Sequence, residues 1–200
     1  MTTTATARGV LFLRRFLRSP REVGALCPST RHLAELMIRD LELDHGATVV
    51  EYGVGTGSFT PTIQRLVDAT PGASYLGVER EPEFVDVLRN RFPTLSFAND
   101  QVEDIERLLA ERALPAPQAI LSGLPLILLP TMDEIIRRTE AVLAPGGEFR
   151  TFSYLQSYPT RAAAKLRRLL KETFDEHSIS EMCWRNFPPA MVLRGKKRNA

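Results

Sequence analysis

The sequence has few of the residues that build metal centres and disulfide frameworks. It contains two cysteines, Cys27 and Cys183, and neither stands in a metal-binding spacing. The three histidines, His32, His45 and His177, are scattered along the chain. Because no metal cluster and no disulfide framework is predicted, a reduced, cytoplasmic setting fits this composition. We expect no metal partner.

Long apolar runs and a large net charge are also missing. No apolar stretch reaches the roughly 18 residues that a membrane-spanning helix needs. Arg14, Arg15 and Arg18 interrupt the apolar stretch near the start, and no small-residue cleavage site follows, so we expect no signal peptide. The 200 residues, 44% hydrophobic and 25% charged with a net charge of +2, are typical of one ordinary globular domain.

Strands and helices are predicted to alternate along the chain. Strands are expected near 48–52, 75–79, 95–98, 118–122 and 147–154, and a last pair near 177–184 and 190–195. Helices are expected near 30–41, 59–68, 82–90, 102–111, 131–143 and 160–173. This alternation indicates an α/β protein with a mostly parallel sheet that carries helices on both faces, and ligands bind such sheets at the carboxyl ends of the strands.

The most informative stretch is residues 49–57, Val-Val-Glu-Tyr-Gly-Val-Gly-Thr-Gly. Apolar β-formers lead to Glu51, and glycine then recurs at Gly53, Gly55 and Gly57. The pattern is typical of a buried strand that ends in a tight turn before a helix. The glycines let a ligand lie against the backbone, and the helix N-terminus attracts an anionic group. The dinucleotide fingerprint would need glycine at position 58, where Ser58 stands.

This acid-x-G-x-G-x-G pattern resembles motif I of the class I S-adenosylmethionine (AdoMet) methyltransferases. The resemblance implies that the turn and its acid bind AdoMet, with the helix N-terminus facing the carboxylate of the methionine part. Glu79 ends the second predicted strand, where an acid that binds ribose hydroxyls is expected. Asp100 ends the third, and in the resembled family an Asp here contacts the adenine amine. Three neighbours complete the expected cofactor site: Arg80, Gln101 and Ser122.

The fourth strand runs into Ser122-Gly123-Leu124-Pro125-Leu126. DNA and RNA adenine methyltransferases carry Asn/Asp-Pro-Pro-Tyr or Asn-Leu-Pro-Tyr at this position, and these residues hold the target base. Here Ser122-Gly123 replaces the amide and Leu126 the aromatic residue, so a base would lose a stacking partner worth ~1–3 kcal/mol. The turn therefore disfavours a nucleobase substrate. We assign Leu124 and Pro125 to the acceptor site and Gly123 to the substrate headgroup; a plain turn is the alternative.

Residues 9–18 predict a short amphipathic helix. One arc of this helix is apolar and the opposite arc basic, the composition of a helix that lies in a membrane interface. The alternative is a helix packed on its own domain with a solvated arginine face. The residues assigned to the membrane are Phe12, Leu13, Arg14, Arg15, Phe16, Leu17 and Arg18. More basic residues occur at Arg161, Lys165, Arg167, Arg168 and Lys171 and in the tail at Arg194, Lys196, Lys197 and Arg198. Anionic lipid headgroups would attract them, and so would RNA phosphates.

Taken together, these stretches resemble the bacterial phospholipid N-methyltransferases, which convert phosphatidylethanolamine stepwise toward phosphatidylcholine. The resemblance covers nearly the whole chain. It is carried by residues 16–25 with Pro28-Ser29-Thr30, the motif I turn, the Ser-Gly-Leu-Pro-Leu string, Phe152-Ser153-Tyr154 with Ser157-Tyr158-Pro159, and Trp184-Arg185-Asn186-Phe187-Pro188-Pro189-Ala190.

The resemblance implies a Rossmann-like class I methyltransferase fold. This fold has a seven-stranded, mostly parallel sheet with an antiparallel C-terminal edge hairpin, helices on both faces and an extra N-terminal amphipathic helix. Residues 1–30 would form that helix and a cofactor lid, and residues 31–200 the methyltransferase domain. Methyl transfer would turn AdoMet into S-adenosyl-L-homocysteine. We expect a monomer, attached peripherally to an anionic membrane surface at the inner face of the cell membrane, with a phospholipid substrate and no nucleic-acid partner.

The resemblance implies that Pro28, Ser29 and Thr30 fold over the methionine end of the cofactor. The roles of three further side chains are hypotheses about the reaction. Tyr154 and Tyr158 would lie near the acceptor, where an aromatic face can hold a methylammonium at ~0.5–2 kcal/mol, or would be ordinary strand and loop tyrosines. Arg185 would meet the lipid phosphate or cap a sheet edge.

Two other functions stay open from the sequence. One is an RNA-modifying enzyme related to the rRNA adenine N6-dimethyltransferases, which share the same core. The other is a non-catalytic membrane protein that binds AdoMet.

Overall fold

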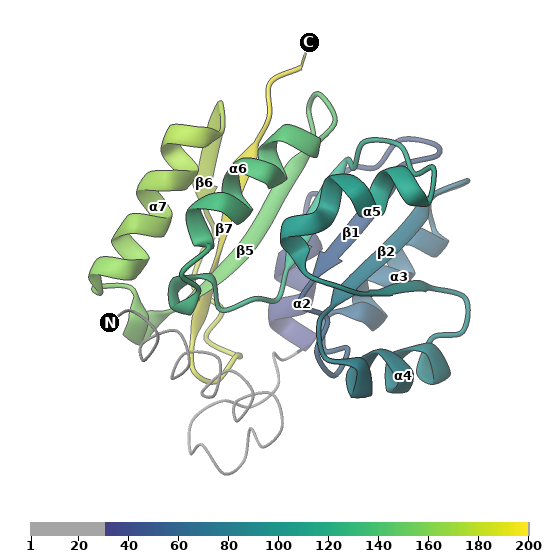
Figure 1. Ribbon diagram of the computed structural model, residues 1–200. Coiled ribbons are helices and arrows are strands. Elements are labelled where there is room, and N and C mark those ends of the chain that lie inside the picture. The colour runs from purple at the N-terminus through teal and green to yellow at the C-terminus, as the bar shows by residue number, and fades with distance from the viewer. Residues whose placement is uncertain (1–30, 200) are drawn as a thin grey trace, which may run out of the picture.

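The computed structural model describes residues 31–199, and its elements follow the predicted alternation (Figure 1). Six α-helices occur in this range: α2 (Arg31–Ile38), α3 (Thr60–Asp68), α4 (Pro82–Arg91), α5 (Ile105–Glu111), α6 (Met132–Val142) and α7 (Arg161–Thr173). Three 3₁₀ turns accompany them: η1 (Val102–Asp104), η2 (Leu126–Leu128) and η3 (Leu155–Ser157). The predicted helix at 9–18, with all seven residues assigned to the membrane, and the Pro28–Ser29–Thr30 lid lie outside the described residues.

Within residues 31–199 the strands form one seven-stranded sheet in the order β3-β2-β1-β4-β5-β7-β6. The first five, β1 (Thr48–Tyr52), β2 (Ser74–Glu79), β3 (Ser96–Asn99), β4 (Ala119–Ser122) and β5 (Glu148–Tyr154), pair in parallel. β7 (Ala190–Lys196) pairs antiparallel with both β5 and β6 (Glu176–Ile179). The predicted Rossmann-like class I methyltransferase sheet with its antiparallel C-terminal edge is therefore confirmed.

One strand boundary was wrong. The sixth strand was predicted to continue to residue 184, but β6 ends at Ile179. Residues 180–189 form a loop instead. Pro188 and Pro189 have no N–H to give to a strand ladder, and the side-chain amide of Asn186 donates to the carbonyl of Pro188 (2.7 Å). The loop is therefore held by turn contacts and by an isolated antiparallel bridge between Cys183 and Ala190.

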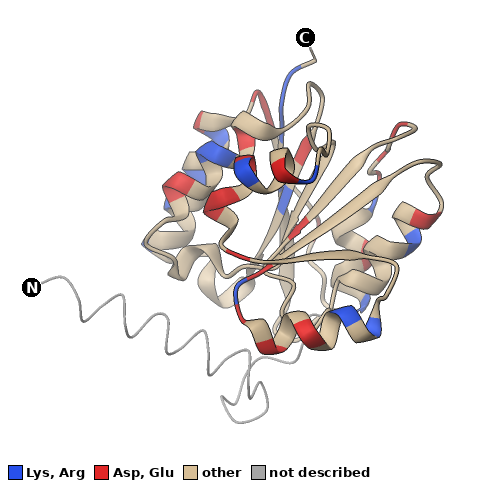
Figure 2. Cartoon of the chain, turned by 45° about the vertical axis from the view of Figure 1, so that its right-hand side comes forward, with Lys and Arg blue, Asp and Glu red and all other residues tan. Residues whose placement is uncertain are grey.

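The sheet is covered on both faces, as the alternation predicted. Helices α5, α6 and α7 pack on one face and α2, α3 and α4 on the other (Figure 1). Every residue of β1 is buried; Val49 packs with the α2–α4 face and Val50 with the opposite face. Such a strand needs apolar side chains in both directions. Charged residues lie mainly on helices and loops around largely uncharged strands (Figure 2). No helix of the described chain is both long and apolar enough to cross a membrane.

A buried arginine connects α2 to the sheet. Arg150 of β5 is fully buried and forms an ion pair with Glu148, with nitrogen–oxygen distances of 2.8 and 2.6 Å. Its guanidinium also donates to the carbonyls of Met37 (3.1 Å) and Arg39 (2.6 Å), where α2 ends. These carbonyls have no partner within the helix, so one side chain caps α2 and attaches it to β5.

The strand order locates the ligand-binding edge. The chain proceeds from β1 outward to β2 and β3, then returns to β4 on the other side of β1. Ligands of such sheets bind at this switch point, outside the carboxyl ends of the strands. The turns after Tyr52, Glu79, Asn99 and Ser122 meet there.

Candidate cofactor site and active site

The motif I turn is built from glycines in the left-handed region of backbone space. Gly53, Gly55 and Gly57 have φ values of +65°, +56° and +78°, which other residues rarely adopt. A Cβ on Gly53 would lie 2.3 Å from the Leu124 side chain, and a Cβ on Gly123 would lie 2.8 Å from the Gly53 carbonyl oxygen. The turn after β1 therefore packs directly against the turn after β4, and glycine is required on both sides.

Glu79 fixes the motif I turn from the neighbouring strand. Its side chain is 5% exposed. Its Oε2 accepts the N–H of Gly55 at 2.8 Å, and its Oε1 accepts the N–H of Glu81 at 2.9 Å. A carboxylate can accept about four hydrogen bonds, so each oxygen keeps capacity for a ligand hydroxyl. This arrangement fits the predicted ribose contact, which stays a prediction.

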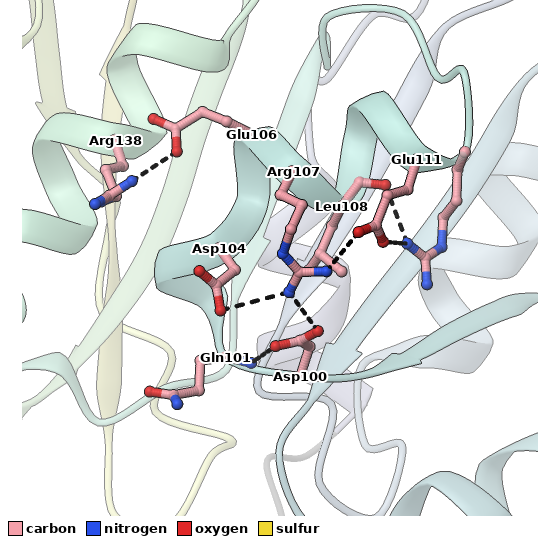
Figure 3. A network of polar contacts seen from close by, with 9 residues as sticks. Asp100, Gln101, Asp104, Glu106, Arg107, Leu108, Glu111 and Arg138 are labelled. Atoms are coloured by element: carbon pink, nitrogen blue, oxygen red, sulfur yellow. Dashed lines mark hydrogen bonds and ion pairs between the residues drawn. The ribbon is translucent and has the colours of Figure 1, made fainter.

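Asp100 is held by an ion-pair network in front of α5 (Figure 3). Its Oδ1 accepts the backbone N–H of Gln101 at 2.9 Å, and its Oδ2 lies 2.7 Å from an Arg107 nitrogen. Arg107 also contacts Glu111 at 2.8 Å and Asp104 at 3.5 Å. The hydrogen bond from Arg107 lowers the pKa of the Asp100 carboxyl. Asp100 is therefore charged at neutral pH and oriented by contacts on both oxygens.

These turns enclose a cavity of about 220 Å³. It joins an acidic side, from the ends of β2 and β3, to an apolar side that follows β4. Eight of the predicted site residues line it: Gly53, Glu79, Arg80, Asp100, Gln101, Gly123, Leu124 and Pro125. Eight further lining residues were not predicted: Val78, Glu81, Val102, Glu103, Leu129, Pro130, Thr131 and Ile135. The structure thus brings together five of the residues assigned to the cofactor and three of those assigned to the acceptor and headgroup.

The unpredicted apolar wall comes from the segment between β4 and α6. Leu129, Pro130 and Thr131 follow η2, and Ile135 lies one turn into α6. The uninterrupted apolar run 126–130 was the available signal in the sequence. The position of η2 over the sheet determines which residues of this run face the cavity. The hydrophobic periodicity of the sequence does not show that position.

Four predicted cofactor residues of the described chain do not line the cavity: Gly55 and Gly57 within the motif I turn, and Glu51 and Ser122 beneath the turns. Glu51 is 1% exposed, and its Oε2 accepts hydrogen bonds from Tyr75 (2.6 Å) and Thr60 (3.0 Å). Its Oε1 has no hydrogen-bond partner among the described residues, and burial raises the pKa of this carboxyl to about 7. Ser122 is fully buried and accepts the N–H of Leu124 at 3.3 Å. Both side chains hold the turns in place.

The residues assigned to the acceptor and headgroup outside these turns are dispersed. Tyr154 packs edge-on against Phe152 (ring centroids 5.3 Å apart) on the α2–α4 face of the sheet. Tyr158 packs on the opposite face, with the Arg167 guanidinium 3.9 Å from its ring centroid. Arg185 is exposed in the 180–189 loop. None of the three lines the cavity of the described chain, and their roles at the acceptor stay predictions.

Several of the late basic residues already have acidic partners. Lys165 lies 2.5 Å from Asp133, and Lys197 lies 3.4 Å from Glu140. β7 runs antiparallel to β5, so the tail that follows it leaves from the edge opposite the cavity. The basic tail therefore does not extend the surface around the cavity.

Comparison with known proteins identifies the family. No protein-family model matches the chain. An ornithine lipid N-methyltransferase from Singulisphaera acidiphila is 30% identical over 197 residues, which cover 94% of this chain and 97% of the relative. The chain belongs to the family of this methyltransferase. A trans-aconitate 2-methyltransferase from Methylobacterium nodulans is 32% identical over 118 residues, covering 59% of this chain and 42% of that protein.

Solved structures of proteins with other activities share the fold. The N-methyltransferase NodS from Bradyrhizobium japonicum, in complex with S-adenosyl-L-homocysteine, aligns with a TM-score of 0.64 at 16% identity over 94% of this chain and 98% of NodS. The [4+2]-cyclase SpnF aligns with a TM-score of 0.65 at 14% identity, over 98% and 97% of the two chains. Because proteins with such different activities share it, the fold by itself does not assign the reaction.

Family membership and the site together assign the cofactor. The left-handed glycine turn, the spare acceptor capacity of Glu79 and the oriented carboxylate of Asp100 fit the polar groups of AdoMet. The protein is an AdoMet-dependent methyltransferase, and S-adenosyl-L-homocysteine is the product of its cofactor.

Proposed function

We propose that this methyltransferase transfers methyl groups to the amine of a lipid headgroup. Phosphatidylethanolamine and its methylated derivatives, toward phosphatidylcholine, are the first candidates, and an ornithine lipid is the second. The observation that carries the proposal is the full-length similarity to an enzyme named for N-methylation of a lipid.

The residues of the cavity would divide between cofactor and acceptor. Glu79 and Asp100 would hold the ribose and the adenine, and the turn formed by Gly123, Leu124 and Pro125 would face the amine. Bound AdoMet supplies a methyl group on a positively charged sulfur. The amine nitrogen forms the new bond to carbon, the carbon–sulfur bond breaks, and the sulfur keeps its electron pair. The protein's contribution would be alignment of the reacting atoms and exclusion of water.

The amine must lose a proton before it attacks. No histidine or cysteine lines the cavity of the described chain. Glu51, whose pKa is raised to about 7, lies beneath the turn, and its Oε2 accepts hydrogen bonds from the hydroxyls of Tyr75 and Thr60. We therefore assign the proton to water or to the lipid phosphate rather than to a histidine or cysteine of the described residues.

The geometry disfavours the RNA-modifying alternative. Leu126, which stands where the adenine methyltransferases carry an aromatic residue, is 2% exposed and packs in the core. It offers no surface on which a base could stack.

Incubation of the full chain with methyl-labelled AdoMet tests the proposal. The acceptors are vesicles with phosphatidylethanolamine, vesicles with an ornithine lipid, vesicles of phosphatidylcholine alone, and total RNA. We expect label in the lipid extract of an amine-containing sample, with methylated headgroups resolved by thin-layer chromatography. An Asp100→Asn variant should lower incorporation, while Glu172→Gln, an exposed carboxylate on α7, should not.

Each of the other outcomes contradicts the proposal. Label in RNA would assign the RNA-modifying function. AdoMet binding without label in any acceptor would assign the non-catalytic function.

A further inference from the structure

The loop between β6 and β7 carries two large aromatic side chains in solvent. Trp184 and Phe187 are each 71% exposed, and Arg185 between them is exposed as well. No other large apolar side chain of the described residues reaches this exposure. Surfaces of this composition, with aromatic residues beside a cation, are unusual for a loop that faces only water.

The exposure of these rings is imposed by a well-anchored loop. Cys183 donates its N–H to the carbonyl of Ala190 at 2.7 Å, and Leu155 donates its N–H to the carbonyl of Pro189 at 2.8 Å. Asn186 is 2% exposed and donates from its side chain to the carbonyl of Pro188. Residues with these contacts thus alternate with the exposed residues Trp184 and Phe187. Burying the two rings in the core would break the hydrogen bonds.

The loop lies on the same edge of the sheet as the cavity. Ala190, which follows the loop, pairs with Tyr154 at the carboxyl end of β5. Leu128 in η2 (44% exposed) and Leu155 in η3 (40% exposed) follow β4 and β5 at this edge. The described chain has six exposed large apolar side chains. Four of them therefore lie in segments at the edge of the sheet where the cofactor cavity opens: Leu128, Leu155, Trp184 and Phe187.

We propose that Trp184, Arg185 and Phe187 form a docking surface for an anionic lipid bilayer, separate from residues 1–30. Aromatic rings with amphipathic character are favoured at the headgroup level of a membrane, and a guanidinium pairs with lipid phosphate. The proposal rests on the proposed function, because a lipid substrate brings the protein to a bilayer. Docking at this edge would turn the cavity toward the headgroups.

A second copy of the chain fits the surface less well. Two aromatic side chains bury about 150–250 Å² each. A stable protein interface buries at least about 1,200 Å² in total. An interfacial lipid contact has no such requirement, since its strength grows with each buried apolar group and each basic residue.

Trp184 is the only tryptophan of the chain, so the fluorescence of the unmodified, full-length protein tests the proposal directly. The probe is a vesicle of phosphatidylglycerol and phosphatidylcholine, neither of which has an amine to methylate. We expect a blue shift of the emission, protection from acrylamide, and quenching by acyl chains brominated near the headgroup. Vesicles of phosphatidylcholine alone should give a smaller shift.

Variants separate this loop from other membrane contacts. Phe187→Ser should weaken vesicle binding about tenfold, because it removes one apolar ring from the interface. Val87→Ser is the matched control, since Val87 is 56% exposed on α4, and it should leave binding unchanged. AdoMet affinity should be the same in both variants and in the parent.

Three results would overturn the proposal. The first is co-sedimentation with vesicles and an unchanged Trp184 spectrum, which would assign binding to another segment. The second is shielding of Trp184 from acrylamide before vesicles are added, independent of protein concentration, which would assign the surface to residues 1–30. The third is shielding that grows with protein concentration, which would assign it to a second copy.

These results are distinguishable from failure of the proposed function. Insertion of Trp184 into vesicles without methylation of any lipid would remove the lipid-methylating function and leave the docking surface. Methylation of bilayer and detergent-dispersed lipid at equal rates, with Trp184 remaining in water, would remove only the docking surface.

Discussion

Glu79 offers the sharpest test of how the cofactor site is built. Its carboxylate joins two turns, with Oε2 on the N–H of Gly55 and Oε1 on the N–H of Glu81. In Glu79→Gln the side chain keeps its size but offers one acceptor oxygen, and its NH₂ would then face a backbone N–H. A hydrogen bond to a charged group contributes about 1.5–3 kcal/mol, so one of the two anchors should be lost at that cost.

Two measurements follow from this substitution. For a domain of 150–250 residues, a loss of about 1.5–3 kcal/mol lowers Tm by roughly 3–12 °C, which thermal unfolding without ligand should show. If Glu79 also accepts a ribose hydroxyl, AdoMet and S-adenosyl-L-homocysteine should each bind roughly 10- to 150-fold more weakly in calorimetry. The matched control is Glu172→Gln, the same chemical change on exposed α7, which should alter neither value.

A Tm that falls with ligand affinity unchanged within about twofold would make Glu79 an anchor of the turn and not a ribose ligand. A variant with unchanged Tm would show that the two backbone contacts contribute nothing to the fold.

Three further perturbations test other parts of the fold. Burial raises the pKa of Glu51 from 4.5 to about 7, so between these two pH values the folded state binds a proton that the unfolded state lacks. The stability that this bound proton contributes is lost as pH rises through about 7. The side chain of Glu51→Gln does not titrate. In unfolding curves from pH 5 to 8, its free energy of unfolding should therefore rise relative to that of the parent by roughly 1 kcal/mol per pH unit up to about pH 7. A difference that stays constant with pH would contradict the assignment. Gly123→Ala should lower stability by about 1–3 kcal/mol and weaken AdoMet binding, because the new Cβ would lie 2.8 Å from the Gly53 oxygen, and unchanged calorimetry would refute this packing. Arg150→Met should lower the free energy of unfolding in urea by about 3–5 kcal/mol, whereas the exposed control Arg168→Met should change it little; equal effects would show that the buried ion pair is not the cause.

The sequence was sufficient for the features that depend on neighbouring residues. The glycine turn after β1, the acids that end β2 and β3, and the break before β5 are local signals, because each requires particular residues next to a buried strand. From their order followed the parallel sheet and one ligand-binding edge. The predicted strand was wrong at residues 180–184, where turn contacts replace regular pairing with β7, because an apolar pattern does not show which groups a loop will bind.

The amino-acid sequence was enough to place the functional groups along the chain: Glu79 ends β2, and Gly53, Asp100 and Gly123 directly follow β1, β3 and β4. Which of these groups lie next to one another depends on the packing of the folded chain. This packing placed Glu51 beneath the turn and Glu79 across it, separated Tyr154 and Tyr158 onto opposite faces, attached α2 through Arg150, and left Trp184 in solvent. These outcomes depend on contacts between segments that are far apart in the chain. The local sequence pattern does not show which side chains take part in such contacts.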